Sequence, residues 1–355
     1  MNKKHWDIFC KVVDNFGDIG LCWRLAKQLA TEHDLIVRLF VDDLPIASKI
    51  IPTIDINKNT QLIDNIEIIK FNCEAKPADV VIEAFACGLP AAYQHLMQTV
   101  TIWVNLEYLS AESWVDDFHG KHSKVGNLTR HFYFPGFTEN TGGLIRENKP
   151  KARDLIAGRD TASHAQSEAL KISLFCYEGA PLTALFHALA GGIVKMIVYA
   201  PLTNTIQQIA PFFGQKSLKA GDVLTKNQLT LQVLPFLSQD DYDALLCACD
   251  LNFVRGEDSW VRAIWAGKPF IWQPYVQTEH AHITKLNAFL ALFYAKNQSA
   301  CEAHGYWSAG QWPEAFWQQY LHDLPIIAAA TQAKSKQLAN QMDLATKLLE
   351  FCIKP

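Results

Sequence analysis

The chain has 355 residues, a formal net charge of -4 at pH 7 and 49% hydrophobic residues. This length is comfortable for two domains, and the weakly acidic balance gives no overall attraction to nucleic acid or to anionic lipid. No uncharged apolar run approaches the length that crosses a bilayer, and Asp7 and Lys11 interrupt any signal-peptide core. The nine cysteines are scattered, without a CxxC pair or zinc-like spacing. We therefore expect a cytoplasmic protein with reduced cysteines that binds neither nucleic acid nor membrane.

The first half of the chain alternates short apolar runs with helical patterns. Residues 6–13 are rich in strand formers, and the run breaks at Asp14-Asn15-Phe16-Gly17-Asp18. A helical pattern follows, with Leu21, Leu25, Ala26 and Leu29 on one face. Further buried strands are predicted at 35–40, 66–71, 80–84 and 100–105. Strands that alternate with helices indicate a parallel sheet with both faces covered.

The second half repeats this alternation after a polar stretch at 137–168, which contains Gly142-Gly143, Pro150 and Gly158 and is predicted to connect two domains. Strands are predicted at 170–176, 194–199, 232–237, 251–254 and 269–274, and helices at 182–190, 240–249, 258–266 and 279–292. The tail at 323–351, rich in Ala, Lys, Gln and Leu, predicts a long C-terminal helix.

The predicted fold class is α/β, with two Rossmann-like domains that face each other across a cleft. The predicted domains are residues 1–160 and residues 161–330, followed by a C-terminal helix at 331–355 that is a candidate to pack back on the first domain. Ligands of such sheets bind at the carboxyl ends of the strands.

The turn Arg255-Gly256-Glu257-Asp258-Ser259 joins a predicted strand to a predicted helix. Backbone N–H groups at the start of a helix carry partial positive charge and suit a diphosphate. Arg255 adds a permanent cation whose fork fits phosphate, and Gly256 permits close approach of the backbone. The alternative is that Asp258 and Ser259 are only helix caps. Glu257, a carboxylate beside an arginine at the open end of a buried sheet, favours a functional turn.

The loop at 14–20 occupies the position of a dinucleotide fingerprint, directly after the first strand and before a helix. Its chemistry is different, because Asp14 and Asp18 would repel a pyrophosphate and instead suit a cationic acceptor such as a guanidinium. The alternative is a turn in which Asp18 caps the following helix, with Asn15 and Gly17 as turn residues only.

Motifs in both halves resemble the family of elongation factor P arginine rhamnosyltransferases (EarP type), which has the GT-B fold. They are Trp-Asp-Ile-Phe-Cys at 6–10, Val-Asp-Asn-Phe-Gly-Asp-Ile-Gly at 13–20, Asn-Leu-Glu-Tyr-Leu-Ser at 105–110, Phe-Pro-Gly-Phe at 134–137, Thr-Gly-Gly-Leu at 141–144 and Arg-Gly-Glu-Asp-Ser at 255–259. The block at 233–290 also resembles the donor-binding half of GT-B glycosyltransferases more generally.

This resemblance implies an inverting glycosyltransferase that moves rhamnose from dTDP-β-L-rhamnose to an arginine of elongation factor P, without a metal or other cofactor. It implies catalytic roles for Asp14, Asp18 and Glu257. The residues implied in substrate binding are Asn15, Phe16, Gly17, Phe175, Tyr177, Gln239, Tyr242, Arg255, Gly256, Asp258 and Ser259.

Two other hypotheses stay open at this point. The same fold also serves other nucleotide-sugar enzymes, with a different acceptor or with epimerase activity. A partner-binding protein that retains a dead cleft is a third hypothesis, but we would expect such a protein to have lost Asp18 or Glu257, and both are present.

Several candidate contacts have a structural alternative. Phe175 and Tyr177 alternate onto one face of a strand, where they either contact the base and sugar or pack in the core. Gln239 either reads the base through its amide or only begins a helix, and Tyr242, one turn further, covers the same pocket.

Two other segments are interpreted as structural. His280-Ala281-His282 lacks a third ligand at metal spacing and is interpreted as a polar helix surface. The aromatic segment at 306–320 lacks interleaved basic residues and is interpreted as packing between domains, not as a platform for nucleic-acid bases.

Overall fold

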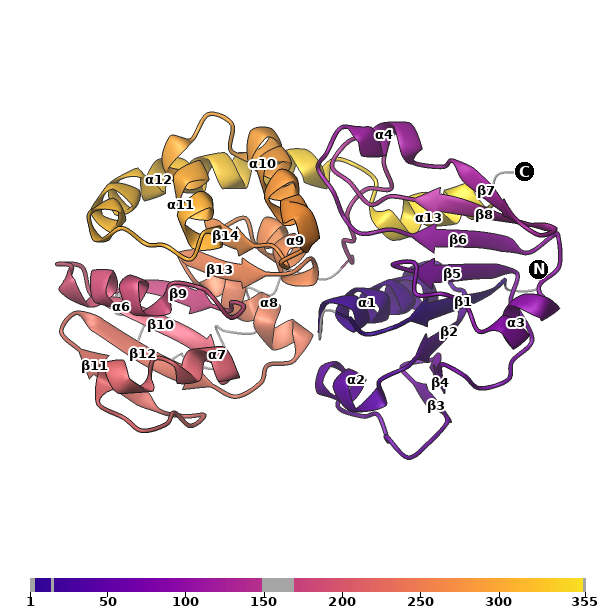
Figure 1. Cartoon of the computed structure of the whole chain (residues 1–355), viewed down its shortest axis with the longest axis horizontal. Coiled ribbons are helices and arrows are strands. Elements are labelled where there is room, and N and C mark those ends of the chain that lie inside the picture. The colour runs from indigo at the N-terminus through magenta and orange to yellow at the C-terminus, as the bar shows by residue number, and fades with distance from the viewer. Residues whose placement is uncertain (1–3, 14–15, 149–168, 354–355) are drawn as a thin grey trace. The chain divides into compact units, whose positions relative to one another are not determined.

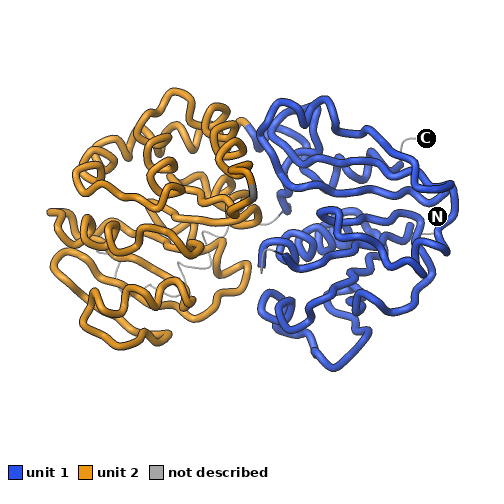
Figure 2. The backbone as a smooth tube through the Cα atoms, in the orientation of Figure 1, with its two compact units in different colours: residues 1–148, 338–355 blue, residues 149–337 orange. Residues whose placement is uncertain are grey.

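The computed structural model describes residues 4–13, 16–148 and 169–353. The chain divides into two compact units, residues 1–148 with 338–355 and residues 149–337, which have different colours in Figure 2. Asp14, Asn15 and most of the predicted connection, with Pro150 and Gly158, lie outside the described residues.

The first unit is built on an eight-stranded sheet with the strand order β3-β4-β2-β1-β5-β6-β8-β7 (Figure 1). The strand pairs inside the sheet are parallel, and the two edge hairpins, β3–β4 and β7–β8, are antiparallel. Its strands are β1 (His5–Cys10), β2 (Ile36–Val41), β3 (Thr60–Ile63), β4 (Ile66–Lys70), β5 (Val80–Ala84), β6 (Ile102–Leu106), β7 (His122–Val125) and β8 (Leu128–Tyr133). The central strands are buried along almost their whole length, as expected where helices cover both faces of a parallel sheet.

The helices of the first unit come from both ends of the chain. They are α1 (Gly17–Glu32), α2 (Leu44–Ile50), α3 (Ala91–Leu96), α4 (Trp114–Phe118) and α13 (Leu344–Ile353). Helix α13 contacts α1, and its Phe351 ring lies 5.4 Å from Tyr133 at the end of β8. The C-terminal segment is thus part of the core of the first unit.

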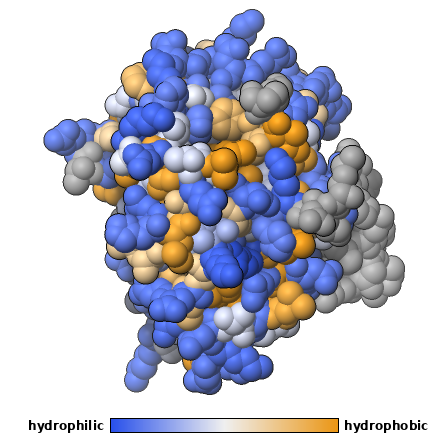
Figure 3. Space-filling view, turned by 90° about the vertical axis from the view of Figure 1, so that its right-hand side faces the viewer, coloured by the Kyte–Doolittle hydropathy of each residue, from blue (hydrophilic) through white to orange (hydrophobic). Residues whose placement is uncertain are grey.

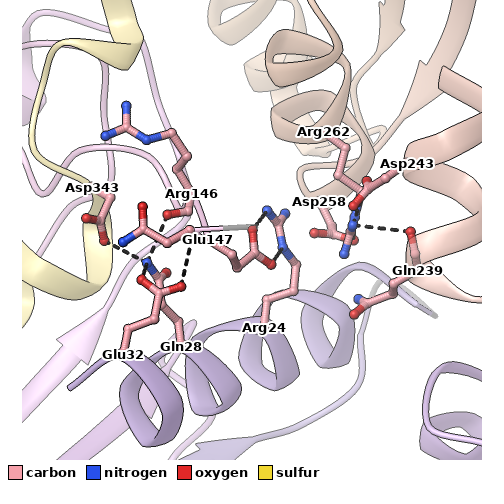
Figure 4. A network of polar contacts seen from close by, with 11 residues as sticks. Arg24, Gln28, Glu32, Arg146, Glu147, Gln239, Asp243, Asp258, Arg262 and Asp343 are labelled. Atoms are coloured by element: carbon pink, nitrogen blue, oxygen red, sulfur yellow. Dashed lines mark hydrogen bonds and ion pairs between the residues drawn. The ribbon is translucent and has the colours of Figure 1, made fainter. Parts of the chain in front are cut away.

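A polar network on α1 joins the two sequence segments of the first unit (Figure 4). Buried Arg24 donates two hydrogen bonds of 2.7 Å to the carboxylate of Glu147. The amide of Gln28 donates to the Arg146 carbonyl at 2.9 Å and to Asp343 Oδ1 at 3.0 Å. One helix therefore holds both the end of the first segment and the beginning of the second.

The second unit is built on a six-stranded sheet with the order β11-β12-β10-β9-β13-β14. All its strand pairs are parallel except the edge hairpin β11–β12. Its strands are β9 (Leu170–Leu174), β10 (Met196–Pro201), β11 (Val223–Lys226), β12 (Leu229–Leu234), β13 (Leu251–Arg255) and β14 (Phe270–Gln273). Its helices are α6 (Leu182–Gly191), α7 (Asn204–Gln207), α8 (Gln239–Ala248), α9 (Asp258–Ala266), α10 (Ala281–Phe293), α11 (Gln298–Ser308) and α12 (Glu314–Ala339), with short 3-10 helices η1 (Ala210–Phe213) and η2 (Thr278–His280).

The predicted α/β class is confirmed, because both sheets are mainly parallel and alternate with helices. The hairpin strands β3, β7, β8 and β11 were missed, since they are short and lack a continuous apolar run. The strand predicted at 232–237 is observed at Leu229–Leu234, because Pro235 cannot donate a ladder hydrogen bond. The long C-terminal helix is present, and it begins at Glu314 and is followed by the separate helix α13.

The aromatic segment at 306–320 packs inside the second unit, which corrects the prediction of packing between domains. The rings of Trp307 and Trp312 lie 4.5 Å and 6.0 Å from the ring of Phe253 in β13. Trp307 and Trp317 are fully buried. These large rings cover one face of the second sheet, and the hydrophobic gain of that burial explains why they cluster.

On the surface, the face drawn in Figure 3 is mostly hydrophilic, with hydrophobic residues in separate groups. Scattered apolar residues of this kind are ordinary on a protein surface. Within the described ranges, no helix combines the length and the apolar character needed to cross a membrane.

His304 of α11 predicts a loss of stability in mild acid. Its ring is fully buried with Nδ1 2.8 Å from the Ala300 carbonyl oxygen, and burial lowers the pKa of His304 to about 4. In the unfolded chain a histidine takes up its proton near pH 6.5, as the reference value indicates. Between these two pKa values the unfolded state binds more protons, so stability falls as the pH is lowered, by up to about 1.4 kcal/mol per pH unit.

The variant His304→Phe removes this titrating group and keeps an aromatic ring. Its Tm should therefore fall less than that of the wild type between pH 7 and pH 5, as measured by scanning calorimetry. An equal fall in both proteins would assign the acid sensitivity to other groups.

Candidate active site

The carboxyl ends of neighbouring strands in the second unit bring the predicted donor-site residues together. Phe175 and Tyr177 follow β9, and Arg255 ends the adjacent strand β13. The Phe175 N–H donates to the Phe253 carbonyl at 3.0 Å, and the Tyr177 N–H donates to Gln273 Oε1 at 2.8 Å. These bonds fix the segment after β9 against β13 and β14.

The guanidinium of Arg255 packs over two aromatic rings. Its Cζ lies 4.1 Å from the ring centroid of Phe175 and 4.6 Å from that of Tyr177, and its Nη1 donates to the Cys176 carbonyl at 3.1 Å. Stacking of this kind orients the guanidinium and leaves it charged. Phe175 and Tyr177 do share one side of the strand end, as the alternation predicts, and they hold the cation there.

The turn after β13 has a backbone that requires glycine. Gly256 has a φ of 59°, in the left-handed region that other residues seldom adopt. Its N–H donates to the Gln273 carbonyl at 3.2 Å, and its carbonyl accepts from Trp272 Nε1 at 2.6 Å. The turn is therefore fixed to the end of β14 from both sides of the glycine.

The side chains of Ser259 and Asp258 in this turn bond to Arg255 and Arg262. Ser259 Oγ accepts the Arg255 N–H at 3.0 Å and also bonds to the Arg255 carbonyl. The Asp258 carboxylate accepts from Arg262 Nε at 2.8 Å. Glu257 is the N-cap residue, and its side chain makes no cap hydrogen bond. These contacts hold the conformation of the turn. They favour a functional turn over the alternative in which Asp258 and Ser259 are only helix caps.

Glu257 is paired with Lys285 of α10. The two side chains are 16% and 12% exposed, so the pair is largely removed from water but still reaches the surface. Sequence analysis missed Lys285, because only the tertiary structure brings α10 beside the start of α9.

Helix α8 contributes Gln239 and Tyr242. Ser238 caps this helix by accepting the Asp241 N–H at 3.1 Å, so Gln239 is its first residue. The Tyr242 ring lies 5.9 Å from that of Phe175, and burial raises the pKa of Tyr242. Both residues therefore lie at the same strand ends as Arg255.

Arg262 of α9 was also missed. Its side chain is 2% exposed and contacts Asp258 and Asp243. The spacing of four residues between Asp258 and Arg262 on a helix is a signal that sequence analysis can use.

In the first unit, Asp18 lies in the first turn of α1. Phe16 is the N-cap residue, without a side-chain cap bond, and Gly17 is the first residue of the helix. Asp18 is 2% exposed, and its Oδ2 accepts the Val13 N–H at 2.8 Å. Asp18 therefore binds the backbone of Val13, and it is not the N-cap residue of α1 that the alternative interpretation expects.

Another carboxylate, Glu107, follows β6 at the same carboxyl edge of the sheet. Asn105 Nδ2 donates to Glu107 Oε1 at 2.5 Å, and Asn105 Oδ1 accepts the Ala86 N–H at 3.1 Å. Burial raises the pKa of Glu107, and the neighbouring Arg130 opposes this shift. Sequence analysis used this stretch only as a family motif and did not identify Glu107 as a site residue.

No group of three His, Cys, Asp or Glu residues that could hold a metal ion occurs in the described part of the chain. His280 is exposed, whereas His282 is buried and its Nδ1 accepts the Gln277 N–H at 3.2 Å. This corrects the interpretation of both histidines as polar surface, because the start of α10 turns the second ring inward.

Comparison with known proteins identifies the family. A family model described as "Elongation-Factor P (EF-P) rhamnosyltransferase EarP" matches residues 6–353. The chain belongs to this family. It is 42% identical to the protein-arginine rhamnosyltransferase of Pseudomonas putida and 39% identical to that of Pseudomonas aeruginosa, in each case over 98% of both chains.

Solved structures agree with this membership. One that concerns EarP-mediated arginine glycosylation of translation elongation factor EF-P is 33% identical, with a TM-score of 0.67 over 98% of each chain. A spinosyn rhamnosyltransferase complexed with thymidine diphosphate is 12% identical, with a TM-score of 0.53 over 98% of this chain and 99% of the other, and shows a shared fold. The predicted family and GT-B fold are thus confirmed, and this member of the EarP family is a glycosyltransferase.

Arg255→Lys is expected to weaken the binding of a nucleoside diphosphate, probed with dTDP, by about tenfold. Lysine keeps the charge but loses the fork and the stack on Phe175 and Tyr177. Calorimetric titration measures the affinity. Arg130→Lys is a matched control, since Arg130 stacks on Trp103 and Phe132 in the first unit and should leave dTDP binding unchanged. Equal affinities for Arg255→Lys and the wild type would remove Arg255 from the site.

Proposed function

We propose that this chain transfers rhamnose from dTDP-β-L-rhamnose to an arginine side chain of elongation factor P, with inversion at the anomeric carbon. The match of residues 6–353 to a single family of elongation factor P rhamnosyltransferases carries this proposal. It is supported by relatives that match 98% of the chain and are described as protein-arginine rhamnosyltransferases.

The donor is assigned to the second half, predicted as residues 161–330, and the acceptor to the first half, predicted as residues 1–160. Arg255, Gly256 and the first turn of α9 are proposed to hold the diphosphate, because a helix start and an arginine both suit an anion. The proposed further donor contacts are Phe175, Tyr177, Gln239, Tyr242, Asp258 and Ser259. The proposed acceptor contacts are Asp14, Asn15, Phe16, Gly17 and Asp18.

The acceptor nitrogen is a weak nucleophile because a guanidinium holds its proton tightly. Its pKa of about 13.8 exceeds that of an aspartate by roughly ten units, so complete deprotonation before attack would cost roughly 13 kcal/mol. A turnover of about one per second tolerates a total barrier of only about 17 kcal/mol. Proton transfer therefore has to accompany formation of the new bond.

In the proposed step, a guanidino nitrogen attacks the anomeric carbon from the side opposite the diphosphate. The C–N bond forms as the C–O bond to dTDP breaks, and the proton passes to Asp18, with Asp14 orienting the planar guanidinium. A single displacement inverts the anomeric centre and needs no covalent sugar–enzyme intermediate. Arg255 and the start of α9 are proposed to stabilise the leaving diphosphate, and Glu257, held by Lys285, is the proposed catalytic carboxylate on the donor side.

We also propose the partners and the location of the reaction. The partners are elongation factor P and the sugar nucleotide, with no metal ion, nucleic acid or membrane required. Because the proposed acceptor is a translation factor, the proposed location is the cytoplasm.

The test is to incubate the protein with dTDP-rhamnose and elongation factor P and to measure the intact mass of the acceptor. One added deoxyhexose that maps to an arginine is expected, and dTDP-glucose serves as the control donor. An unchanged acceptor mass, or a sugar on another residue type, would contradict the proposal.

Asp18→Asn is expected to abolish nearly all transfer and to retain dTDP affinity. Asparagine can still accept the Val13 N–H, so this hydrogen bond is kept while the charge and the basicity of the Asp18 carboxylate are lost. Asp42→Asn is a matched control, because Asp42 accepts the neighbouring Val12 N–H at 2.9 Å. Rates come from the intact-mass assay and affinities from calorimetry. Substantial transfer by Asp18→Asn would place the base elsewhere, with Asp14 and Glu257 next in line.

A further inference from the structure

Arg262 of α9 makes contacts with two helices through one guanidinium (Figure 4). Its Nε donates to Asp258 Oδ2 at 2.8 Å, within α9 itself. Its Nη1 donates to Asp243 Oδ1 at 2.7 Å and to the Gln239 carbonyl at 3.5 Å, both in α8. The Arg262 side chain is only 2% exposed, whereas Asp258 and Asp243 are 15% and 30% exposed, so the guanidinium end of these bonds is buried and the carboxylates reach the surface.

The two helices that Arg262 joins carry much of the proposed donor site. Gln239 and Tyr242 lie on α8, which follows β12, whereas Asp258 and Ser259 lie at the start of α9, which follows β13. In the sheet, β12 and β13 are separated by β10 and β9. Helix α8 leads into β13 and α9 leaves it, so the chain links the two helices through that strand, and the Arg262 side chain adds direct bonds from α9 to Asp243 and Gln239 of α8.

Arg262 also controls the charge at the start of α9. Asp258 lies in the first turn of this helix, where a carboxylate competes with an anionic ligand for the same positive end of the helix. The bond to Arg262, four residues further along, directs the Asp258 carboxylate along the helix and compensates its charge. Asp243 of α8 pairs with Nη1 of the same guanidinium.

We propose that Arg262 is a positioning residue for the sugar-nucleotide donor. It holds α8 against α9 and neutralises Asp258 beside the diphosphate position, without touching the donor itself. This inference rests on the proposed function for the location of the donor. A purely structural ion pair would stabilise the second unit and leave donor affinity unchanged, so the two roles can be separated by experiment.

The experiment compares Arg262→Lys, Asp243→Asn and the control Arg38→Lys in the full-length protein. Arg38 Nε and Nη2 donate to Asp7 in the first unit, both at 2.6 Å, so the control loses the same kind of two-pronged ion pair in the other unit. Three quantities are measured for each variant: the dTDP affinity by calorimetry, the KM for dTDP-rhamnose together with kcat, and the Tm.

Lysine has one terminal nitrogen in place of the separate Nε and Nη1 donors that bind Asp258 and Asp243. Arg262→Lys is therefore expected to raise the dTDP Kd and the donor KM by about tenfold, with kcat within about threefold of wild type. Asp243→Asn keeps the bond between Arg262 and Asp258, and a rise of about threefold in both constants is expected. Arg38→Lys should lower the Tm and leave both constants unchanged.

An unchanged Kd and KM in Arg262→Lys, with a lowered Tm, would overturn the proposal and make Arg262 structural. A fall in kcat with unchanged Kd and KM would also overturn it. If Arg262→Lys does not fold, Asp243→Asn decides, and an unchanged Kd and KM there overturns the proposal. If the wild type binds dTDP but does not transfer rhamnose, the proposed function fails, and the dTDP affinities of the variants still decide the role of Arg262.

Discussion

The first unit depends on the polar contacts of α1, because it is assembled from two segments that lie far apart in the sequence. Arg24 binds Glu147 at the end of the first segment, and Gln28 binds Asp343 near the start of the second. Removing one partner of the buried Arg24–Glu147 pair would cost about 3–5 kcal/mol. The bond from Gln28 to Asp343 ties the C-terminal segment to the same helix. The same helix carries Asp18, the proposed base, in its first turn. The helix that joins the two sequence segments therefore also positions this carboxylate.

In the second unit, side chains from several elements hold the turn at 255–259. Aromatic rings after β9 hold Arg255, α10 supplies Lys285 to Glu257, and Arg262 holds Asp258. Charged groups that are fixed before the ligand arrives need little reorganisation when charge develops on a leaving group. Such a turn suits a reaction in which negative charge accumulates on a diphosphate. Acidic residues can stand beside the proposed anion position because Glu257 is paired with Lys285 and Asp258 with Arg262.

The edge of the first sheet that is proposed to bind the acceptor carries carboxylates. Asp18 and Glu107 place carboxylates at the carboxyl edge of the first sheet, with Asn105 holding one oxygen of Glu107. Burial raises the pKa of Glu107, so this carboxyl keeps its proton to a higher pH than an exposed glutamate does. An edge that carries these carboxylates suits the cationic acceptor that we propose for the first unit.

The sequence by itself determined the α/β class, most of the buried strands and the chemical character of the two key turns, because alternation, glycine positions and charge are local properties. It also determined the family, since the motifs at 13–20 and 255–259 lie within the chain segment that the family model matches. Hairpin strands such as β7 and β11 were not predicted, because short edge strands that are at least partly exposed along their whole length show little alternation of apolar and polar residues. Only the tertiary structure decided that Lys285 faces Glu257, that Arg262 joins α8 to α9, and that Asp343 reaches Gln28. These contacts join residues that are distant in sequence, and no local propensity encodes which distant charge a buried side chain will meet.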